Sequence, residues 1–363
     1  MPSRLRATVL LLLALTLLGA GPIRGPAHGG TVVASPPWEA GKALWNPYDP
    51  VGEVVPPTTE PNQRMRAVEE YRGYVYLLGK SGTLYTYDTR DLPGLTTFAT
   101  YAVPISSVNV GVYSMLLRNG TWLYACGDGG LAVIDLGNPA RPLLRVLPDG
   151  PGGDNMFQSG ERLFVGEKGV ATIYSLADPS HPVAIGTYNA PDKFIFGVAA
   201  YNDTLYLAES TSDSGNLLRV LSISDPSHPT SVGSQTLPDW TYHLRVLNGQ
   251  LIVANQSSVS LFSLANPRQP QLLDTQATGG RVCAIDGGNV VLPGLVYRST
   301  DDHLVEVAHY TTGQGQRDGY PYGSAVGSGF VFLAQTSRAL ILKSAAAPEA
   351  WPYHLYLPVM RKG

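Results

Sequence analysis

A repeat of about forty residues constrains the fold of this chain more than any other feature. The four clearest units each contain an alternating apolar run, then Asn or Asp followed by Pro, and then a second run. Alternation with a period of two predicts half-buried strands, and Asn-Pro or Asp-Pro favours a tight turn. The four clearest units cover residues 129–147, 169–188, 217–237 and 259–276.

A further pair of predicted strands precedes the turn in each unit, which gives four strands per repeat. Weaker copies on both sides bring the number of units to seven, and a four-stranded sheet recurring at this period is typical of a propeller blade. A low charged fraction of 15%, with 40 Gly and 29 Pro, also favours short strands and turns. We therefore predict an all-β fold, a seven-bladed β-propeller, with six or eight blades as alternatives. The second strands should begin near Tyr74, Trp122, Leu163, Leu205, Leu251, Val290 and Phe330.

The last unit lacks an outer strand, because its third strand at residues 339–343 is followed by an alanine-rich segment. The sequence WNPYDPVGEVV (residues 45–55) has the turn and outer strand of a repeat without the inner strands. We predict that residues 51–55 complete the last blade and close the ring, which would remove two exposed sheet edges. The propeller would then span residues 45–346. The alternative is that residues 28–63 are a loose linker.

The N-terminus has the layout of a secretory signal peptide. Arg4 and Arg6 precede an apolar run at residues 7–18 and small residues at 19–21. We expect a signal peptide at residues 1–20, a linker at 21–44, and a protein located outside the cell or on its surface. A permanent anchor is the alternative, but the apolar run is shorter than the twenty or so residues that a spanning helix needs. No later stretch resembles a transmembrane segment.

The charge of the chain limits the classes of partner, and the positions of its two cysteines bear on whether they form a disulfide. The formal net charge is -3 and no long run of like charges occurs, so we expect no nucleic-acid partner. We expect a monomer. Cys126 and Cys283 fall in the second and sixth predicted blades, too far apart for a disulfide, and are expected to be unpaired thiols.

The units VIDLGNPARP, YSLADPSHP, LSISDPSHP and FSLANPRQP resemble the LVIVD repeat of exported bacterial proteins. The resemblance covers roughly residues 64–343 and is weaker at 89–93 and 299–303, where the Asp-Pro-x-x-Pro pattern is lost. It implies a propeller at or beyond the cell surface and brings no catalytic residues. The C-terminal segment WPYHLYLPVMRKG is similar to the tails of exported proteins of Chloroflexota-type bacteria. We interpret residues 347–363 as a sorting or attachment signal, with a strand packed on the propeller as the alternative.

The most conspicuous polar residues belong to turns. His181 and His228 recur at the same place in two Ser-His-Pro turns, which indicates a structural role. The loop at residues 213–216 could hold Ca²⁺, but it lacks the alternating carboxylates of a calcium loop, and a solvated hairpin is favoured. No motif of a hydrolase nucleophile, zinc site or phosphate-binding loop is present. We predict no catalytic residues, no metal site and no cofactor, with calcium as the one weakly supported possibility.

Binding residues in propellers gather where the inner strands begin around the central channel, and these residues need not repeat. Aromatic faces with a polar rim suit sugars, peptides or aromatic ligands, although each such residue could instead pack between blades. The candidates are Arg66, Tyr113, Asn155, Phe196, Trp240, Tyr242, His243, Arg281, Tyr320 and Tyr322.

These residues favour an exported or cell-surface binding or scaffold protein that uses one propeller face for a protein or glycan partner. The alternative is an extracellular propeller enzyme, such as a lyase, a lactonase or a glycoside-acting enzyme. Such an enzyme needs convergent acids. The only paired acids on a predicted inner strand are Glu69 and Glu70, and adjacent strand residues face opposite sides.

Overall fold

The computed structural model describes residues 48, 50–55, 65–80, 82–90, 101–104, 115–127, 130–146, 153, 155–210, 215–280, 284–310, 323–335 and 338–345, with 101–104, 115 and 146 described by backbone alone. All of them fall in one compact unit, Asn46–Gly363. The predicted signal peptide (1–20), the linker (21–44) and the C-terminal tail (347–363) lie outside the described residues and remain predictions.

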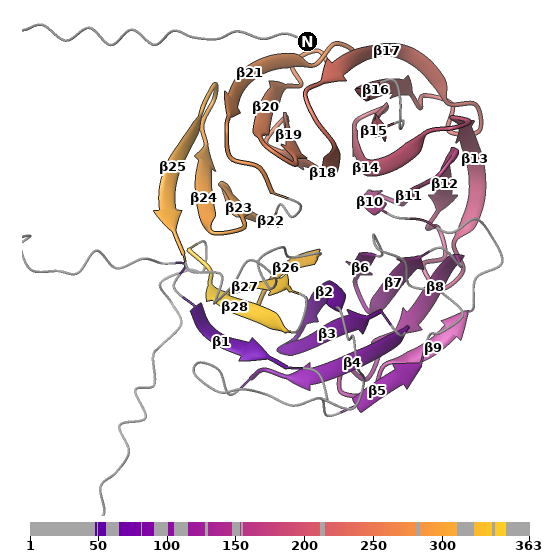
Figure 1. Cartoon of the computed structure of the whole chain (residues 1–363). Helices are drawn as coiled ribbons and strands as arrows, with labels where there is room; N and C mark the ends of the chain where they lie inside the picture. Colours follow the sequence, from indigo (N-terminus) through magenta and orange to yellow (C-terminus); the bar gives the residue numbers. More distant parts are fainter. Residues whose placement is uncertain are drawn as a thin grey trace, which may run out of the picture. The chain divides into compact units, whose positions relative to one another are not determined.

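The strands form seven four-stranded antiparallel sheets around a common centre (Figure 1). We number these blades in chain order, starting with the blade that contains β2. Blade 1 comprises β2 (Met65–Tyr71), β3 (Tyr74–Gly79), β4 (Thr83–Asp88) and β5 (Tyr101–Pro104), from the innermost strand outward. Blade 2 comprises β6 (Met115–Asn119), β7 (Trp122–Gly127), β8 (Gly130–Asp135) and β9 (Leu143–Val146). Blade 3 comprises β10 (Asn155–Ser159), β11 (Arg162–Glu167), β12 (Val170–Ser175) and β13 (Val183–Asn189).

The remaining blades follow the same order. Blade 4 comprises β14 (Phe194–Tyr201), β15 (Thr204–Ser210), β16 (Asn216–Ser222) and β17 (Thr230–Leu237). Blade 5 comprises β18 (Thr241–Leu247), β19 (Gln250–Asn255), β20 (Val259–Ser263) and β21 (Gln271–Gln276). Blade 6 comprises β22 (Ala284–Asp286), β23 (Asn289–Leu292), β24 (Leu295–Ser299) and β25 (Leu304–His309), and blade 7 comprises β26 (Gly323–Gly327), β27 (Phe330–Ala334), β28 (Ala339–Lys343) and β1 (Pro50–Val54).

This arrangement confirms the predicted seven-bladed all-β propeller. The second strand of every blade begins within one residue of the predicted position. The hairpins that join the innermost and second strands explain this accuracy, because their turn residues take left-handed backbone angles. Asn248 and Gly249 have φ angles of 49° and 73°, as a two-residue hairpin of the Asn-Gly type requires.

The hydrophobic core lies between blades. Seven buried apolar clusters occur among the described residues, and each joins two neighbouring blades, including blade 7 with blade 1. The joint between blades 1 and 2, for example, contains Leu84 and Leu123, both fully buried. Each blade therefore depends on its neighbours for burial of its apolar faces, so that a missing blade face would expose apolar surface to water.

The Asn-Pro or Asp-Pro turns also join neighbouring blades. A tyrosine hydroxyl on the second strand of one blade donates a hydrogen bond to the proline carbonyl in the turn of the next blade. This bond recurs with the same length of 2.8 Å at Tyr76 and Pro139, at Tyr124 and Pro179, and at Tyr206 and Pro267. The repeated proline thus serves both its own turn and the packing between blades.

The side chains of these turns have the predicted structural role. Asp178 Oδ1 accepts a hydrogen bond from Ser180 N at 2.9 Å, and Asp225 Oδ1 accepts one from Ser227 N at 3.0 Å. His181 and His228 are exposed, and their Nδ1 atoms lie 3.3 Å and 3.0 Å from Oδ2 of Asp178 and Asp225, respectively. The predicted turn chemistry is therefore confirmed at both histidines.

The N-terminal strand closes the ring. β1 pairs antiparallel with β28, with Val54 opposite Ala339, and so completes blade 7 as its outermost strand. The structure places this strand one residue earlier than the predicted residues 51–55. Glu53 in β1 forms an ion pair with Arg338, the residue directly before β28. Cys126 is buried in β7 of blade 2, while Cys283 lies outside the described residues.

Candidate functional site

The innermost strands all begin at one end of the central channel, because every blade has the same strand order. We call this end the entry end. Of the residues predicted to bind a partner there, the structure describes Arg66, Asn155, Phe196, Trp240, Tyr242 and His243. The others, Tyr113, Arg281, Tyr320 and Tyr322, lie outside the described residues.

Asn155 joins three blades at the entry end. Asn155 is the first residue of β10 in blade 3 and is 3% exposed. Nδ2 donates to the carbonyl oxygen of Phe196 at 2.8 Å and to that of Tyr242 at 3.2 Å, in blades 4 and 5. The buried Oδ1 atom has no hydrogen-bond partner among the described residues. Asn155 therefore fixes the positions of two aromatic residues relative to each other.

Four aromatic residues of blades 4 and 5 form a stacked set that we call the aromatic ladder: Phe194, Phe196, Trp240 and Tyr242. The ring centroids of Phe194 and Phe196 are 5.5 Å apart with nearly parallel planes, and those of Phe196 and Trp240 are 5.2 Å apart. Tyr242 is tilted against Phe196 at 6.4 Å. These are favourable aromatic geometries. Phe194 and Trp240 are half-buried, whereas the other two are buried.

A polar rim borders the ladder. Asp239, which is half-buried, accepts hydrogen bonds from the Trp240 backbone N at 2.6 Å and from Ser257 Oγ at 2.9 Å. The Tyr242 hydroxyl donates to Gln256 Oε1 at 3.2 Å. The ladder thus combines partly exposed aromatic faces with a carboxylate and an amide at its edge.

Arg66 and His243 contribute less accessible surface than their positions suggested. Arg66 is only 1% exposed and His243 is 9% exposed. Burial, and to a smaller degree the charge of Arg245, hold the pKa of His243 well below its usual value. His243 is therefore a neutral imidazole at physiological pH, and its Nδ1 atom has no hydrogen-bond partner in the described part of the chain.

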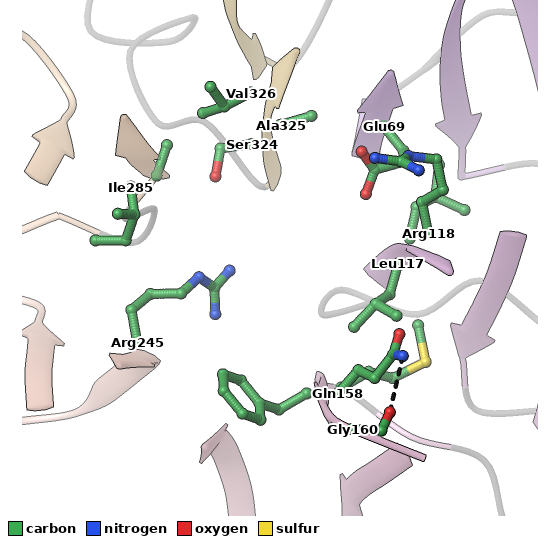
Figure 2. Close-up of a pocket in the computed structure, with 14 residues that line it drawn as sticks. Glu69, Leu117, Arg118, Gln158, Gly160, Arg245, Ile285, Ser324, Ala325 and Val326 are labelled. Carbon is green, nitrogen blue, oxygen red and sulfur yellow. Dashed lines mark hydrogen bonds between the residues drawn. The ribbon is translucent and has the colours of Figure 1, made fainter. Parts of the chain in front are cut away.

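A cavity of about 520 Å³ occupies the channel and is lined by innermost strands of six blades (Figure 2). We call it the channel pocket. Its charged lining residues are Glu69, Arg118 and Arg245, and Gln158 and Ser324 add polar groups. Gln158 Nε2 donates to the carbonyl oxygen of Gly160 at 3.1 Å. Apolar side chains complete the wall: Leu116, Leu117, Met156, Phe157, Ala284, Ile285, Ala325 and Val326.

The neighbouring acids Glu69 and Glu70 have separate environments. Burial raises the pKa of Glu69 to about 7, although the Glu70 backbone N–H and the Arg118 charge partly oppose this rise. Glu70 is buried elsewhere and accepts hydrogen bonds from Gly73 N and Ser328 Oγ, each at 2.6 Å. Only Glu69 lines the channel pocket, so the two acids do not form a shared site.

Sequence reasoning missed Arg118, Gln158, Arg245 and Ser324. Of these four, only Arg245 has a signal in the repeat. When the innermost strands are aligned on their last ladder pair, Glu69 and Arg245 take the same place, two residues before that pair. The other blades have uncharged residues there: Leu117, Phe157, Ala199, Ala284 and Ala325. A charge at a place that is otherwise apolar indicates a role outside the fold.

Among the described residues, no three His, Cys, Asp or Glu side chains converge on a point that could hold a metal ion. Asp213 and Ser214 of the candidate calcium loop lie outside that set, so calcium binding there stays a prediction. The described segments contain no helix with the length and apolar character needed to cross a membrane.

Comparison with known proteins supports the repeat and the fold. The family profile described as "LVIVD repeat" matches residues 119–146 and 197–236, within blades 2 and 4. The chain therefore contains LVIVD repeats, as its sequence indicated. No curated protein matches it significantly.

Solved structures resemble the chain in fold. A chain of a mitotic checkpoint complex has a TM-score of 0.59 at 11% identity, covering 90% of this chain and 98% of that one. The WD40 β-propeller domain of Doa1 has a TM-score of 0.58 at 11% identity, covering 81% and 97%. Sqt1 of Saccharomyces cerevisiae has a TM-score of 0.52 at 9% identity, covering 79% and 82%. At such identities these likenesses show a propeller fold.

Proposed function

We propose that this LVIVD-repeat propeller is an exported or cell-surface binding or scaffold protein whose partner, a protein or a glycan, docks on the aromatic ladder at the entry end. The observation that carries the proposal is the stack of Phe194, Phe196 and Trp240, partly open to solvent and bordered by Asp239. Partly exposed aromatic faces beside polar groups supply both contact area and directional hydrogen bonds to a partner.

The ladder is suited to binding because it is held rigidly. Its members stand at the beginnings of β14 and β18, and Asn155 bonds to the backbone of both strands. A preorganised surface loses little conformational entropy when a partner docks, so more of the contact energy appears as affinity. Exposed loops would lack this advantage.

The alternative function is an extracellular propeller enzyme, and Glu69 is the observation in its favour. A carboxyl group with a pKa of about 7 in a cavity could transfer a proton near neutral pH. The described lining of the channel pocket supplies no second acid to work with it. Binding therefore accounts for more of the structure than acid–base catalysis.

Export is part of the proposal and rests on the N-terminal sequence. The basic start, apolar run and small residues of positions 1–21 support a cleaved signal peptide. N-terminal sequencing of the protein recovered from outside the cytoplasm tests it. A mature chain that begins near residue 21 is expected, and a chain that keeps residues 1–20 in the cytoplasm would contradict export.

The docking proposal is tested with glycan and peptide arrays probed with the full-length mature protein. Trp240→Ala should weaken array binding by roughly thirtyfold, because removing an aromatic hot spot costs about 2 kcal/mol or more. Tyr188→Ala is the matched control, since Tyr188 is a half-buried aromatic residue on the outermost strand β13. Binding that survives Trp240→Ala, or no binding by the wild type on either array, would contradict the proposal.

A further inference from the structure

We infer that the channel pocket is a second binding site, which takes a small organic carboxylate with an apolar body. Arg245 holds the carboxylate, Arg118 adds positive charge from the opposite wall, and the apolar body packs against Leu117, Phe157 and Ile285. This site is separate from the aromatic ladder, and the inference does not depend on the docking proposal.

The size and construction of the cavity fit a small molecule. Its volume of about 520 Å³ lies within the range of roughly 300–1,000 Å³ that is typical of small-molecule sites. Innermost strands β2, β6, β10, β18, β22 and β26 supply all of the lining except Gly160, which lies in the turn after β10. Sites on strands hold their side chains more precisely than sites on loops do.

The charge of the lining selects an anion. Two arginines and one glutamate are its charged members, which leaves one excess positive charge even when Glu69 is ionised. The whole chain carries a formal net charge of -3, so the sign of the charge in the channel pocket is opposite to that of the protein as a whole. A concave site of one sign with low-dielectric walls concentrates ions of the opposite sign.

The arrangement of the arginines favours a carboxylate. Figure 2 shows the Arg245 side chain extending into the cavity from β18, while Arg118 lies beside Glu69 on the other side. Arg245 Nη1 donates to the carbonyl oxygen of Leu244 at 2.9 Å, which orients the side chain. The planar guanidinium group presents paired donors that match the two oxygens of a carboxylate.

The apolar wall of the pocket indicates the chemistry of the ligand beyond its carboxylate group. Leu117, Phe157, Ile285 and Val326 face the same cavity as the arginines. An inorganic anion would leave this surface in contact with water, whereas an aliphatic or aromatic body would bury it, which is favourable. The pocket therefore fits an amphiphilic carboxylate better than a bare ion.

Glu69 should make the site sensitive to pH. The charged groups that act on Glu69 are Arg118 on β6 and Glu70 on β2. Tyr76 on β3 lies opposite Glu69 in the strand register, and Tyr71 on β2 packs under Arg118. Arg245 lines the same cavity, and the lining residues of β26 are uncharged. With a pKa of about 7, Glu69 is mostly protonated at pH 6 and mostly ionised at pH 8. A bound carboxylate is repelled by ionised Glu69, so affinity should fall as the pH rises. If only the protonated form binds, the change is at most about tenfold.

The test uses ligand-observed NMR with the full-length protein and a set of aliphatic and aromatic monocarboxylates, each paired with its neutral amide. We expect carboxylates to bind and their amides to bind at least about tenfold more weakly. Equal binding of both members of the pairs, or no binding by any carboxylate, would overturn the inference.

Variants of the lining residues test whether the carboxylate binds in the channel pocket. Arg245→Gln should weaken carboxylate binding at least about tenfold, whereas Arg145→Gln on the outer strand β9 should leave it unchanged. Leu117→Trp, which fills the cavity without altering its charge, should also abolish binding and serves if the Arg245 variant does not fold. Glu69→Gln should bind as tightly at pH 8 as at pH 6. Unchanged binding in both Arg245→Gln and Leu117→Trp would refute the site.

Discussion

Replacing Tyr48 with Phe tests whether the hydrogen bonds between Tyr48 and blade 6 stabilise the closed ring of blades. The Tyr48 hydroxyl donates to Asp286 Oδ2 at 2.8 Å and accepts from Asn289 Nδ2 at 2.9 Å, and it thereby ties the residues before β1 to blade 6. Asp286 is 1% exposed and also accepts from Ser344 Oγ at 2.6 Å and Ala345 N at 3.0 Å, just after β28. Burial, and then Asp286, raise the pKa of Tyr48 above its usual range, so the phenol remains a donor.

The expected cost follows from these bonds. A hydrogen bond to a buried charged group contributes about 1.5–3 kcal/mol, and Asn289 also loses an acceptor, so we expect a loss of about 3 kcal/mol. Unfolding entropy of about 2.1 cal/mol/K per residue gives about 0.7 kcal/mol/K for a unit the size of Asn46–Gly363. The melting temperature of Tyr48→Phe should therefore fall by about 4 °C.

Differential scanning calorimetry measures this fall, and Tyr87→Phe is the matched control. The Tyr87 hydroxyl is also near β1, but it donates to a neutral acceptor, the Val55 carbonyl oxygen, at the longer distance of 3.2 Å. Its loss should cost about 1 kcal/mol, or roughly 1–2 °C. Equal shifts in the two variants, or a shift of less than about 1 °C in Tyr48→Phe, would refute the assigned role of the Asp286 network.

Two further predictions concern the joints between blades. Gly186→Ala should lower the free energy of unfolding by about 1–3 kcal/mol, because its new Cβ would lie 1.8 Å from the Pro226 carbonyl oxygen. Gly233→Ala, in the next blade, meets its nearest atom at 3.9 Å and should change stability little; urea denaturation that gave both variants the same stability would contradict this packing. Deleting residues 46–55 removes β1, and thermal scanning with light scattering should show a melting temperature lower by more than about 10 °C and aggregation through the exposed edge of β28. A deletion that melted like the intact protein would show that β1 does not hold the ring closed.

The fold was largely predictable because its determinants are local and repeated. Asn or Asp before Pro sets the turn in blades 2 to 5, and alternating apolar residues at the same spacing locate the strands of the other blades. The closing strand was predictable for the same reason, since residues 45–55 carry the turn pattern without inner strands. Its observed start at Pro50 differs by one residue, which is within the usual uncertainty of strand ends.

The proposed binding residues were predictable only in part. Trp240, Tyr242 and Phe196 could be chosen as aromatic residues near the starts of inner strands, but their stacking depends on how blades 4 and 5 meet. The channel pocket was not predicted at all. Glu69, Arg118 and Arg245 come from three blades, and no local pattern states that their side chains converge.

The repeating residues should carry stability and the residues that vary between blades should carry binding, and one paired measurement of melting temperature and ligand binding tests this division directly. Trp240→Ala and Arg245→Gln should lose array binding and carboxylate binding respectively, with melting temperatures within about 1 °C of the wild type. The double variant Tyr124→Phe/Tyr206→Phe loses two bonds to neighbouring blades, each worth about 1 kcal/mol, so it should melt about 3 °C lower and bind normally. Loss of binding in the double variant, or melting temperatures that fall equally in all three proteins, would contradict this division.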